Sequence, residues 1–249
     1  MDRYGLIGYP LKHSFSQGFF NDKFAAENVN AEYINFEITS IKELKSVLKE
    51  NPALKGLNVT SPYKEQVIPY LDELSENVKL IGAVNVIKII RNKGKIKTKG
   101  YNSDIVGFKQ SIEPLVQDPP QNALILGTGG SSKAVFYGLK QLGVSSTFVS
   151  RNKSDGVLVY EELTPEIMDH NKIIVNCTPV GMWPNVDDYP AIPYDLLTKD
   201  HLLYDLIYNP NETTFMRKGK EFGASVKNGL EMLILQAYVS WDIWSGKDN

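Results

Sequence analysis

A short glycine-rich segment has the composition of a phosphate-binding turn. The apolar run 124–126 is followed by Gly127 and Gly129, and a helical pattern begins directly after them. In such a segment, backbone N–H groups and a helix N-terminus come close to a pyrophosphate. Ser132 stands where the G-x-G-x-x-G pattern has its third glycine, so a plain strand-to-helix turn is the alternative interpretation.

Two cations follow the next expected strand, 144–149, and they bear on the choice of dinucleotide. Arg151 and Lys153 come about 20 residues after the glycines, where NAD sites carry Asp or Glu and NADP sites carry Arg. An arginine fork and a lysine ammonium both suit a 2′-phosphate. We therefore expect NADP(H) as the cofactor, and two solvated surface cations are the alternative.

Composition favours an enzyme of two domains and argues against several other classes. The 249 residues exceed the usual length of one domain, and the 42% apolar content can supply two cores. The net charge of −2 argues against a nucleic-acid-binding surface. No apolar run approaches the roughly 20 residues of a membrane span. The single cysteine, Cys177, predicts a reducing cytoplasm, and the three histidines lack metal-ligand spacing.

Alternating strand-like and helix-like segments predict an α/β fold. The expected strands are 4–8, 31–38, 54–59, 84–90, 95–99, 123–126, 144–149, 173–177 and 202–206. The expected helices are 14–28, 40–50, 104–115 and 230–244. Ser40 and Glu43 form a capping-box pattern at the start of the second helix. The turn residues 92–94 predict that 84–90 and 95–99 form a hairpin.

Four polar clusters follow an expected strand or open an expected helix, which is where ligand-binding side chains gather in open α/β sheets. They are Ser14-Phe15-Ser16, the segment 56–65 with Asn58, Thr60 and Lys64, Ala83-Val84-Asn85 and Gly100-Tyr101-Asn102-Ser103-Asp104. Each has a purely structural alternative, because serine caps helices, asparagine ends them and aspartate favours their first turn. Hydroxyls gathered in one cleft would suit a polyhydroxylated or carboxylate-bearing ligand.

Lys64 is the candidate acid–base group. Asn58 and Thr60 alternate with apolar residues, so we expect both on the face of the strand that is not buried. Pro62 suits the first turn of a helix, which would place Lys64 beside the positive end of the helix dipole. A solvated surface lysine is the alternative. In the functional interpretation, Asp104 faces Lys64 across a cleft.

Taken in order, these motifs resemble the shikimate dehydrogenase family over essentially the whole chain. The matching motifs are Gly8-Tyr9-Pro10, Ser14-x-Ser16, Asn58-Val59-Thr60, Lys64, Ala83-Val84-Asn85, Gly100-Tyr101-Asn102-Ser103-Asp104, the glycine segment and Gly229-Leu230-Glu231-Met232-Leu233-Ile234-Leu235-Gln236-Ala237. The resemblance implies an α/β substrate-binding domain, 1–101 with 229–249, and a Rossmann-like NADP-binding domain, 102–228. An active-site cleft is expected between them.

The resemblance also implies a role for each matching position. Lys64 and Asp104 match the catalytic pair, and no metal is implied. The substrate-binding positions are Ser14, Ser16, Asn58, Thr60, Asn85, Tyr208 and Gln236. The cofactor-binding positions are Gly127, Thr128, Gly129, Gly130, Ser131, Ser132, Arg151, Lys153, Thr178, Gly181, Gly229 and Met232. Two departures from the family pattern are Ser103, where threonine is usual, and Ser150, where asparagine is common.

The implied reaction is the reversible reduction of 3-dehydroshikimate to shikimate by NADPH, in the chorismate route to aromatic amino acids. Hydride transfer to a ring ketone develops an alkoxide, to which the Lys64 ammonium would donate a proton while Asp104 orients both groups. We expect a cytoplasmic monomer or homodimer whose partners are small molecules, without nucleic acid or membrane. The alternatives are an NAD-using quinate/shikimate dehydrogenase and a catalytically silent nucleotide-binding regulator.

Overall fold

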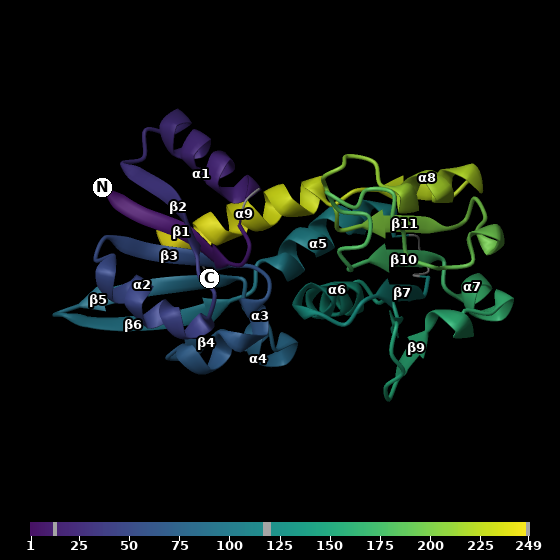
Figure 1. The fold of residues 1–249 in the computed structure, drawn as a ribbon, viewed down its shortest axis with the longest axis horizontal. Helices are drawn as coiled ribbons and strands as arrows, with labels where there is room; N and C mark the ends of the chain where they lie inside the picture. The colour runs from purple at the N-terminus through teal and green to yellow at the C-terminus, as the bar shows by residue number, and fades with distance from the viewer. Residues whose placement is uncertain (12–13, 117–120, 248–249) are drawn as a thin grey trace. The chain divides into compact units, whose positions relative to one another are not determined.

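The computed structural model describes residues 1–11, 14–116 and 121–247, which form two compact units (Figure 1). The first unit comprises Met1–Ser103 and Ala237–Asn249, and the second comprises Asp104–Gln236. The sequence places the two boundaries at 101/102 and 228/229, whereas the compact units change at 103/104 and 236/237. The second change therefore lies inside the last helix, α9 (Leu230–Ser245).

The first unit contains a six-stranded mixed sheet with the order β2-β1-β3-β5-β6-β4. Its strands are β1 (Asp2–Gly8), β2 (Ala31–Glu37), β3 (Leu54–Val59), β4 (Glu73–Leu74), β5 (Val86–Asn92) and β6 (Lys95–Tyr101). The strand β1 pairs in parallel with β2 and β3, and β5 pairs antiparallel with β3 and β6. The predicted hairpin is confirmed, and Lys93 and Gly94 at its turn have the positive φ angles, 46° and 79°, that two-residue hairpins favour.

Helices cover both faces of this sheet. They are α1 (Phe15–Ala26), α2 (Leu44–Glu50), α3 (Tyr63–Gln66), α4 (Glu76–Ile81) and the last part of α9, with 3-10 turns at Ile41–Glu43 and Ile68–Tyr70. Leu44 and Leu48 of α2 pack in one apolar cluster with the sheet, and Phe20 of α1 and Trp244 of α9 pack in another. The capping box of Ser40 and Glu43 is confirmed, although it opens a 3-10 turn that precedes α2.

The second unit contains a six-stranded parallel sheet with the order β12-β11-β10-β7-β8-β9. Its strands are β7 (Ala123–Leu126), β8 (Ser146–Ser150), β9 (Val157–Val159), β10 (Ile173–Asn176), β11 (Leu202–Asp205) and β12 (Ser225–Lys227). Numbered from β7, the order is the 3-2-1-4-5-6 arrangement of dinucleotide-binding sheets. The predicted Rossmann-like topology is confirmed, and the strand order reverses between β7 and β10.

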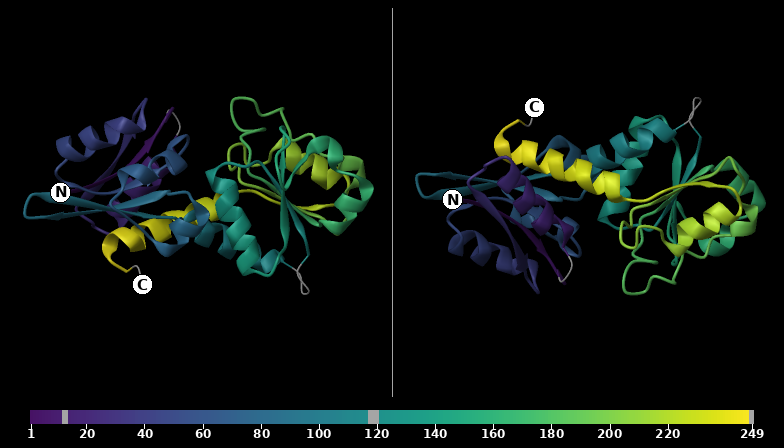
Figure 2. Two further views of the ribbon diagram at one scale, coloured as in Figure 1. Left: turned by 90° about the horizontal axis from the view of Figure 1, so that it is seen from below. Right: turned by 90° about the horizontal axis from the view of Figure 1, so that it is seen from above.

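Helices also lie on both faces of the second sheet, as Figure 2 shows. They are α5 (Asp104–Ile112), α6 (Gly130–Gln141), α7 (Pro165–His170) and α8 (Thr214–Glu221), with 3-10 turns at Glu113–Leu115, Tyr160–Glu162 and Tyr194–Leu196. Alternate residues of β7 join opposite apolar clusters: Leu124 packs with Phe215 of α8, whereas Ile125 packs with Phe108 of α5. Burial on both faces explains why the sequence of β7 is continuously apolar.

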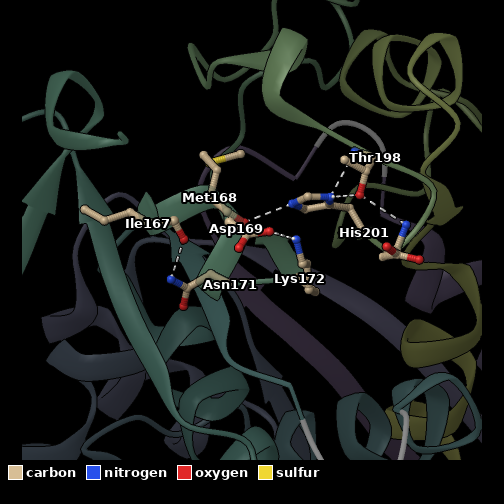
Figure 3. A network of polar contacts seen from close by, with 8 residues as sticks. Ile167, Met168, Asp169, Asn171, Lys172, Thr198 and His201 are labelled. Carbon is tan, nitrogen blue, oxygen red and sulfur yellow. Dashed lines mark hydrogen bonds and ion pairs between the residues drawn. The ribbon is translucent and has the colours of Figure 1, made fainter. Parts of the chain in front are cut away.

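His201 is a buried structural residue of the second unit (Figure 3). Its Nδ1 accepts the Thr198 N–H at 3.0 Å, and its Nε2 lies 3.0 Å from the Met168 carbonyl oxygen. Because these two contacts need one acceptor and one donor on the ring, His201 is the neutral Nε2–H tautomer. Burial lowers the pKa of His201, in agreement with the neutral form.

Two classes of feature are absent from the described residues. Within 1–11, 14–116 and 121–247, none of the helices has the length and apolar character required to cross a membrane. The same ranges hold no group of three or more His, Cys, Asp or Glu side chains that could bind a metal ion.

Candidate active site

A buried polar network in the first unit brings together Ser16, Asn58 and Asn85, three of the expected substrate-binding residues. The Asn58 Oδ1 accepts a hydrogen bond from the Tyr33 hydroxyl at 2.8 Å. The Asn58 Nδ2 donates to the Asn85 carbonyl at 3.2 Å and to the Ser240 Oγ at 3.1 Å. Burial raises the pKa of Tyr33 well above its usual value, and a hydrogen bond to Ser16 opposes that rise.

Asn58 lies deeper than the alternation of the strand predicts. We expected Asn58 and Thr60 on the unburied face of β3, but Asn58 is only 6% exposed and its neighbours Leu57 and Val59 are also buried. The reason is that β3 is an interior strand, paired with β1 and β5, whose two faces are both covered. Thr60, which follows the strand, is half-buried.

Asn85 ties β3 to the segment that precedes α5. Its carbonyl accepts the Val59 N–H at 2.8 Å, its Oδ1 accepts the Ser103 N–H at 2.7 Å, and its Nδ2 donates to the Ser103 Oγ at 2.9 Å. The Ser103 Oγ lies 3.1 Å from the Ser240 Oγ, which closes the network. Asp104 is the next residue in the chain, so the network also fixes the backbone that leads into it.

Lys64 is half-buried and lies on a single helical turn. The helix α3 spans only Tyr63–Gln66, and Pro62 occupies its N-cap and not its first turn. One turn aligns few peptide dipoles, so the helix dipole that the sequence predicts beside Lys64 is weak. The Lys64 carbonyl accepts the Val84 N–H at 2.7 Å, which joins this turn to the segment that carries Asn85.

Ser14 has a buried hydroxyl with unused hydrogen-bonding capacity. It occupies the N-cap of α1, but its side chain makes no capping hydrogen bond. Among the described residues, the Ser14 Oγ meets no hydrogen-bond partner. A buried polar atom in this state costs about 1–3 kcal/mol. The Ser14 hydroxyl is therefore suited to a ligand, and the capping role that the sequence allowed is not realised.

Asp104, Tyr208 and Gln236 belong to the second unit. A Cβ on Gly107 would lie 2.7 Å from the Met232 carbonyl oxygen and 2.9 Å from the Gln236 backbone nitrogen, so α5 and α9 are in close contact here. Asp104 precedes Gly107 by three residues and lies on the same face of α5. The Gln236 side chain donates to the Leu233 carbonyl at 2.8 Å. Burial raises the pKa of Tyr208.

The glycine segment has the geometry of a phosphate-binding turn. Gly127 has a φ of 104°, which favours glycine, and a Cβ there would lie 3.1 Å from the Thr178 Cγ2. Gly129 is the N-cap of the 12-residue α6, and no described atom outside Gly129 and its two chain neighbours lies within 4 Å of the position that a Cβ would take. Ser132 is buried and donates to the Gly129 carbonyl at 2.6 Å, so a serine fits the third-glycine position.

A cavity of about 460 Å³ lies beside this turn in the second unit. Its lining residues are Thr128, Lys133, Phe148, Ser150, Asn152, Lys153, Ser154 and Val157. Lys153 was expected here, whereas Arg151 is exposed and is not among the lining residues. Lys133 also lines the cavity, and its place in the first turns of α6, directly after the glycine segment, is the sequence signal that identifies it. Burial raises the pKa of Tyr160, and the charge of the nearby Arg151 opposes that rise.

A buried carboxylate shapes the loop that carries Thr178. The Asp205 Oδ1 accepts from the Asn176 Nδ2 at 3.1 Å and the Ile207 N–H at 3.0 Å, and its Oδ2 accepts from the Thr213 hydroxyl at 2.6 Å. The Asn176 Oδ1 in turn accepts from the Thr178 N–H at 3.0 Å and hydroxyl at 2.7 Å. Burial raises the pKa of Asp205 to about 6.

Three further positions expected at the cofactor have clear packing constraints. Gly181 has a φ of 97°, and a Cβ there would lie 3.0 Å from the Asp188 carbonyl oxygen. A Cβ on Gly229 would lie 2.1 Å from the Leu206 carbonyl oxygen, so the backbone after β12 admits only glycine. Met232 is buried in the apolar cluster that contains Ile125.

Comparison with known proteins finds relatives that match the chain along its length. The model of the shikimate dehydrogenase substrate binding domain matches residues 6–87. A shikimate dehydrogenase (NADP(+)) of Methanococcus aeolicus is 38% identical, over 97% of this chain and 91% of the relative. The shikimate dehydrogenase structure from Aquifex aeolicus is 38% identical with a TM-score of 0.86, covering 99% of this chain and 93% of that one. The structure of a Thermus thermophilus shikimate 5-dehydrogenase, in complex with NADP(H) and shikimate, is 28% identical with a TM-score of 0.85. It covers 99% of this chain and 94% of that one.

Proposed function

The chain belongs to the shikimate dehydrogenase family, and we propose that it catalyses the reversible reduction of 3-dehydroshikimate to shikimate with NADPH. The observation that carries this proposal is the buried hydroxyl and amide network of the first unit, together with the Ser14 hydroxyl, which meets no hydrogen-bond partner in the part of the chain that the structure describes. A ligand with a carboxylate and several hydroxyls offers both the acceptors and the donors that such groups need.

The first unit would bind the substrate ring. The residues proposed to contact its carboxylate and hydroxyls are Ser14, Ser16, Asn58, Thr60, Asn85, Tyr208 and Gln236. Three hydrogen bonds hold Asn58 and use both of its N–H groups, so the contact proposed for it is a ligand hydroxyl that donates to its fixed amide oxygen. Preorganised contacts lower the entropy that is lost on binding.

Replacing Ser14 or Gln236 by alanine should weaken shikimate binding far more than NADP⁺ binding. Each residue is assigned to the substrate and not to the dinucleotide, and one lost buried hydrogen bond costs on the order of 1–3 kcal/mol. Isothermal titration calorimetry with each ligand separately measures both affinities. A loss of NADP⁺ affinity with shikimate affinity intact would show that Ser14 and Gln236 do not belong to the substrate site.

The second unit would bind the dinucleotide, and its residues fit that group. The open backbone at Gly129 leaves room for a pyrophosphate at the N-terminus of α6, and Lys133 and Lys153 bring positive charge to the adjacent cavity. We assign residues 127–132 to the pyrophosphate and Arg151 and Lys153 to the 2′-phosphate. Thr178 and Gly181 would border the ribose, and Gly229 and Met232 the nicotinamide.

The chemistry of the chain is proton transfer and orientation. NADPH, when bound, supplies the hydride. The Lys64 ammonium would donate a proton to the substrate oxygen as negative charge develops on it, and Asp104 would orient the lysine and the substrate hydroxyl. In the reverse direction, Lys64 would take the proton from the hydroxyl of shikimate.

Replacing Arg151 by alanine should weaken NADPH binding at least roughly tenfold, the low end for a charged hydrogen bond, and leave NADH binding almost unchanged. Only NADPH carries the phosphate that the guanidinium would hold, whereas the glycine segment serves both cofactors. Fluorescence titration with the two reduced cofactors measures the difference. Lys153→Ala should act in the same direction but less, and equal losses for both cofactors in Arg151→Ala would contradict the phosphate role.

An assay of shikimate and quinate oxidation, with NADP⁺ and NAD⁺ in parallel, tests the proposed function against its alternatives. We expect the highest kcat/KM with shikimate and NADP⁺. A preference for quinate and NAD⁺, or no activity with any pair, would contradict the proposal. These alternatives are not favoured, because the relatives are named NADP(+) enzymes and two lysines line the cavity.

We further propose a cytoplasmic monomer or homodimer without a nucleic-acid or membrane partner.

A further inference from the structure

Lys153, which lines the cavity in the second unit, forms an ion pair with Glu162. The Lys153 Nζ lies 2.7 Å and 2.6 Å from the two carboxylate oxygens of Glu162. Glu162 ends the 3-10 turn Tyr160–Glu162, and its Oε2 also accepts the Val159 N–H at 2.9 Å. The hydrogen bonds from Lys153 and Val159 lower the pKa of Glu162, so the carboxylate is charged at neutral pH.

The geometry makes Glu162 the fixed member of the pair. Its carboxylate is anchored to the backbone of Val159 by a hydrogen bond. Lys153 has a long, flexible side chain, so the carboxylate determines the position of the Lys153 ammonium. The negative charge therefore remains within 3 Å of a cation that lines the cavity. A phosphate that approached Lys153 would meet this carboxylate as well.

Acidic and basic groups have opposite effects at the ribose of a dinucleotide. A carboxylate accepts a hydrogen bond from the free 2′-hydroxyl of NAD, whereas a basic residue accommodates the 2′-phosphate of NADP. This cavity contains Lys133 and Lys153, and Glu162 is bonded to one of them. The phosphate carries about −1.5 to −2 charges at neutral pH, so its repulsion by a neighbouring carboxylate is appreciable.

We propose that Glu162 is a selectivity residue that weakens the preference of this chain for NADP over NAD. The inference rests on the proposed function, because it concerns the dinucleotide that the second unit binds. Glu162 would act by repelling the 2′-phosphate and by competing with it for Lys153. Repulsion between two unit charges about 5 Å apart in water corresponds to roughly a fourfold change in affinity, which salt reduces.

Glu162→Gln tests this role with little change in shape, because the amide keeps an oxygen that can accept the Val159 N–H. The matched control is Glu161→Gln, which removes the same charge from the exposed neighbouring residue. Calorimetric titration of the full chain gives the Kd for NADP⁺, and displacement of fluorescent NADPH gives the Kd for NAD⁺. We expect Glu162→Gln to tighten NADP⁺ by roughly threefold or more at low ionic strength, with no tightening of NAD⁺.

Two results would overturn the inference. Unchanged or weaker NADP⁺ binding in Glu162→Gln would mean that Glu162 merely orients Lys153. An equal gain in Glu161→Gln would mean that net charge, and not this contact, sets the affinity. If the unmodified chain failed to bind NADP⁺, the proposed function would be contradicted together with the selectivity role. If the unmodified chain binds NADP⁺ but Glu162→Gln gives no gain in affinity, only the selectivity role is contradicted. Thermal unfolding of the unmodified chain and of both variants checks that the compared proteins are equally folded.

Discussion

Replacing Lys64 by alanine is expected to lower the turnover of 3-dehydroshikimate by roughly 100-fold or more, the usual scale for loss of a general acid. The reason is that the oxygen of the ketone gains negative charge as the hydride arrives, and water at neutral pH is a far poorer proton donor than a positioned ammonium. Shikimate should still bind measurably, because its carboxylate and other hydroxyls are assigned to other residues. Steady-state kinetics with NADPH, combined with calorimetric titration of shikimate, separates the two effects.

Lys45→Ala is the matched control for the lysine variant. Lys45 is an exposed residue of α2 in the same unit, so its replacement removes an equal charge away from the polar network. We expect its turnover to stay near that of the unmodified chain. Near-normal turnover in Lys64→Ala at neutral pH would remove Lys64 from the catalytic pair and leave it a surface charge.

Replacing Asp205 by alanine is expected to lower the free energy of unfolding by roughly 3 kcal/mol at neutral pH. The change removes the acceptor of three buried donors, on Asn176, Ile207 and Thr213, at once. NADP⁺ affinity should fall with it, because Asn176 also fixes the loop that carries Thr178. Urea unfolding at several pH values measures the stability, with Asp187→Ala at an exposed loop position as the control.

The pH dependence of this effect has a definite sign. In the folded chain, burial raises the pKa of Asp205 from 3.8 to about 6, so the folded state binds the proton more tightly than the unfolded state. The contribution of Asp205 to stability therefore falls as the pH rises between these values. The destabilisation in Asp205→Ala should shrink over that range. Equal unfolding free energies for the variant and the unmodified chain at every pH would contradict the role of the buried carboxylate.

Features set by neighbouring residues were predictable from the sequence. The apolar run of β7 and the glycines that follow it predict a strand, a turn and a helix, because each step depends on only a few adjacent residues. The hairpin of β5 and β6 and the capping box of Ser40 are local in the same way. The alternation of strands and helices then limits the second unit to a few topologies.

Features that depend on distant partners were not predictable in this way. The hydrogen bond between Asn58 and Ser240 joins residues 182 positions apart, and neither residue type reveals the other. The depth of Asn58 depends on the apolar clusters that cover both faces of β3, which the pattern of one strand does not show. The single turn of α3 and the pairing of Lys153 with Glu162 likewise depend on tertiary structure.

Transfer of a labelled hydride tests the central claim most directly. The full chain would be incubated with 3-dehydroshikimate and NADPH that carries deuterium at both hydrogens of nicotinamide C4, and the product would be analysed by mass spectrometry. The proposed reaction predicts shikimate with one deuterium, bound to the ring carbon that had carried the ketone. Failure to form shikimate, or formation of shikimate without the label, would contradict the claim that this chain is a 3-dehydroshikimate reductase that uses NADPH.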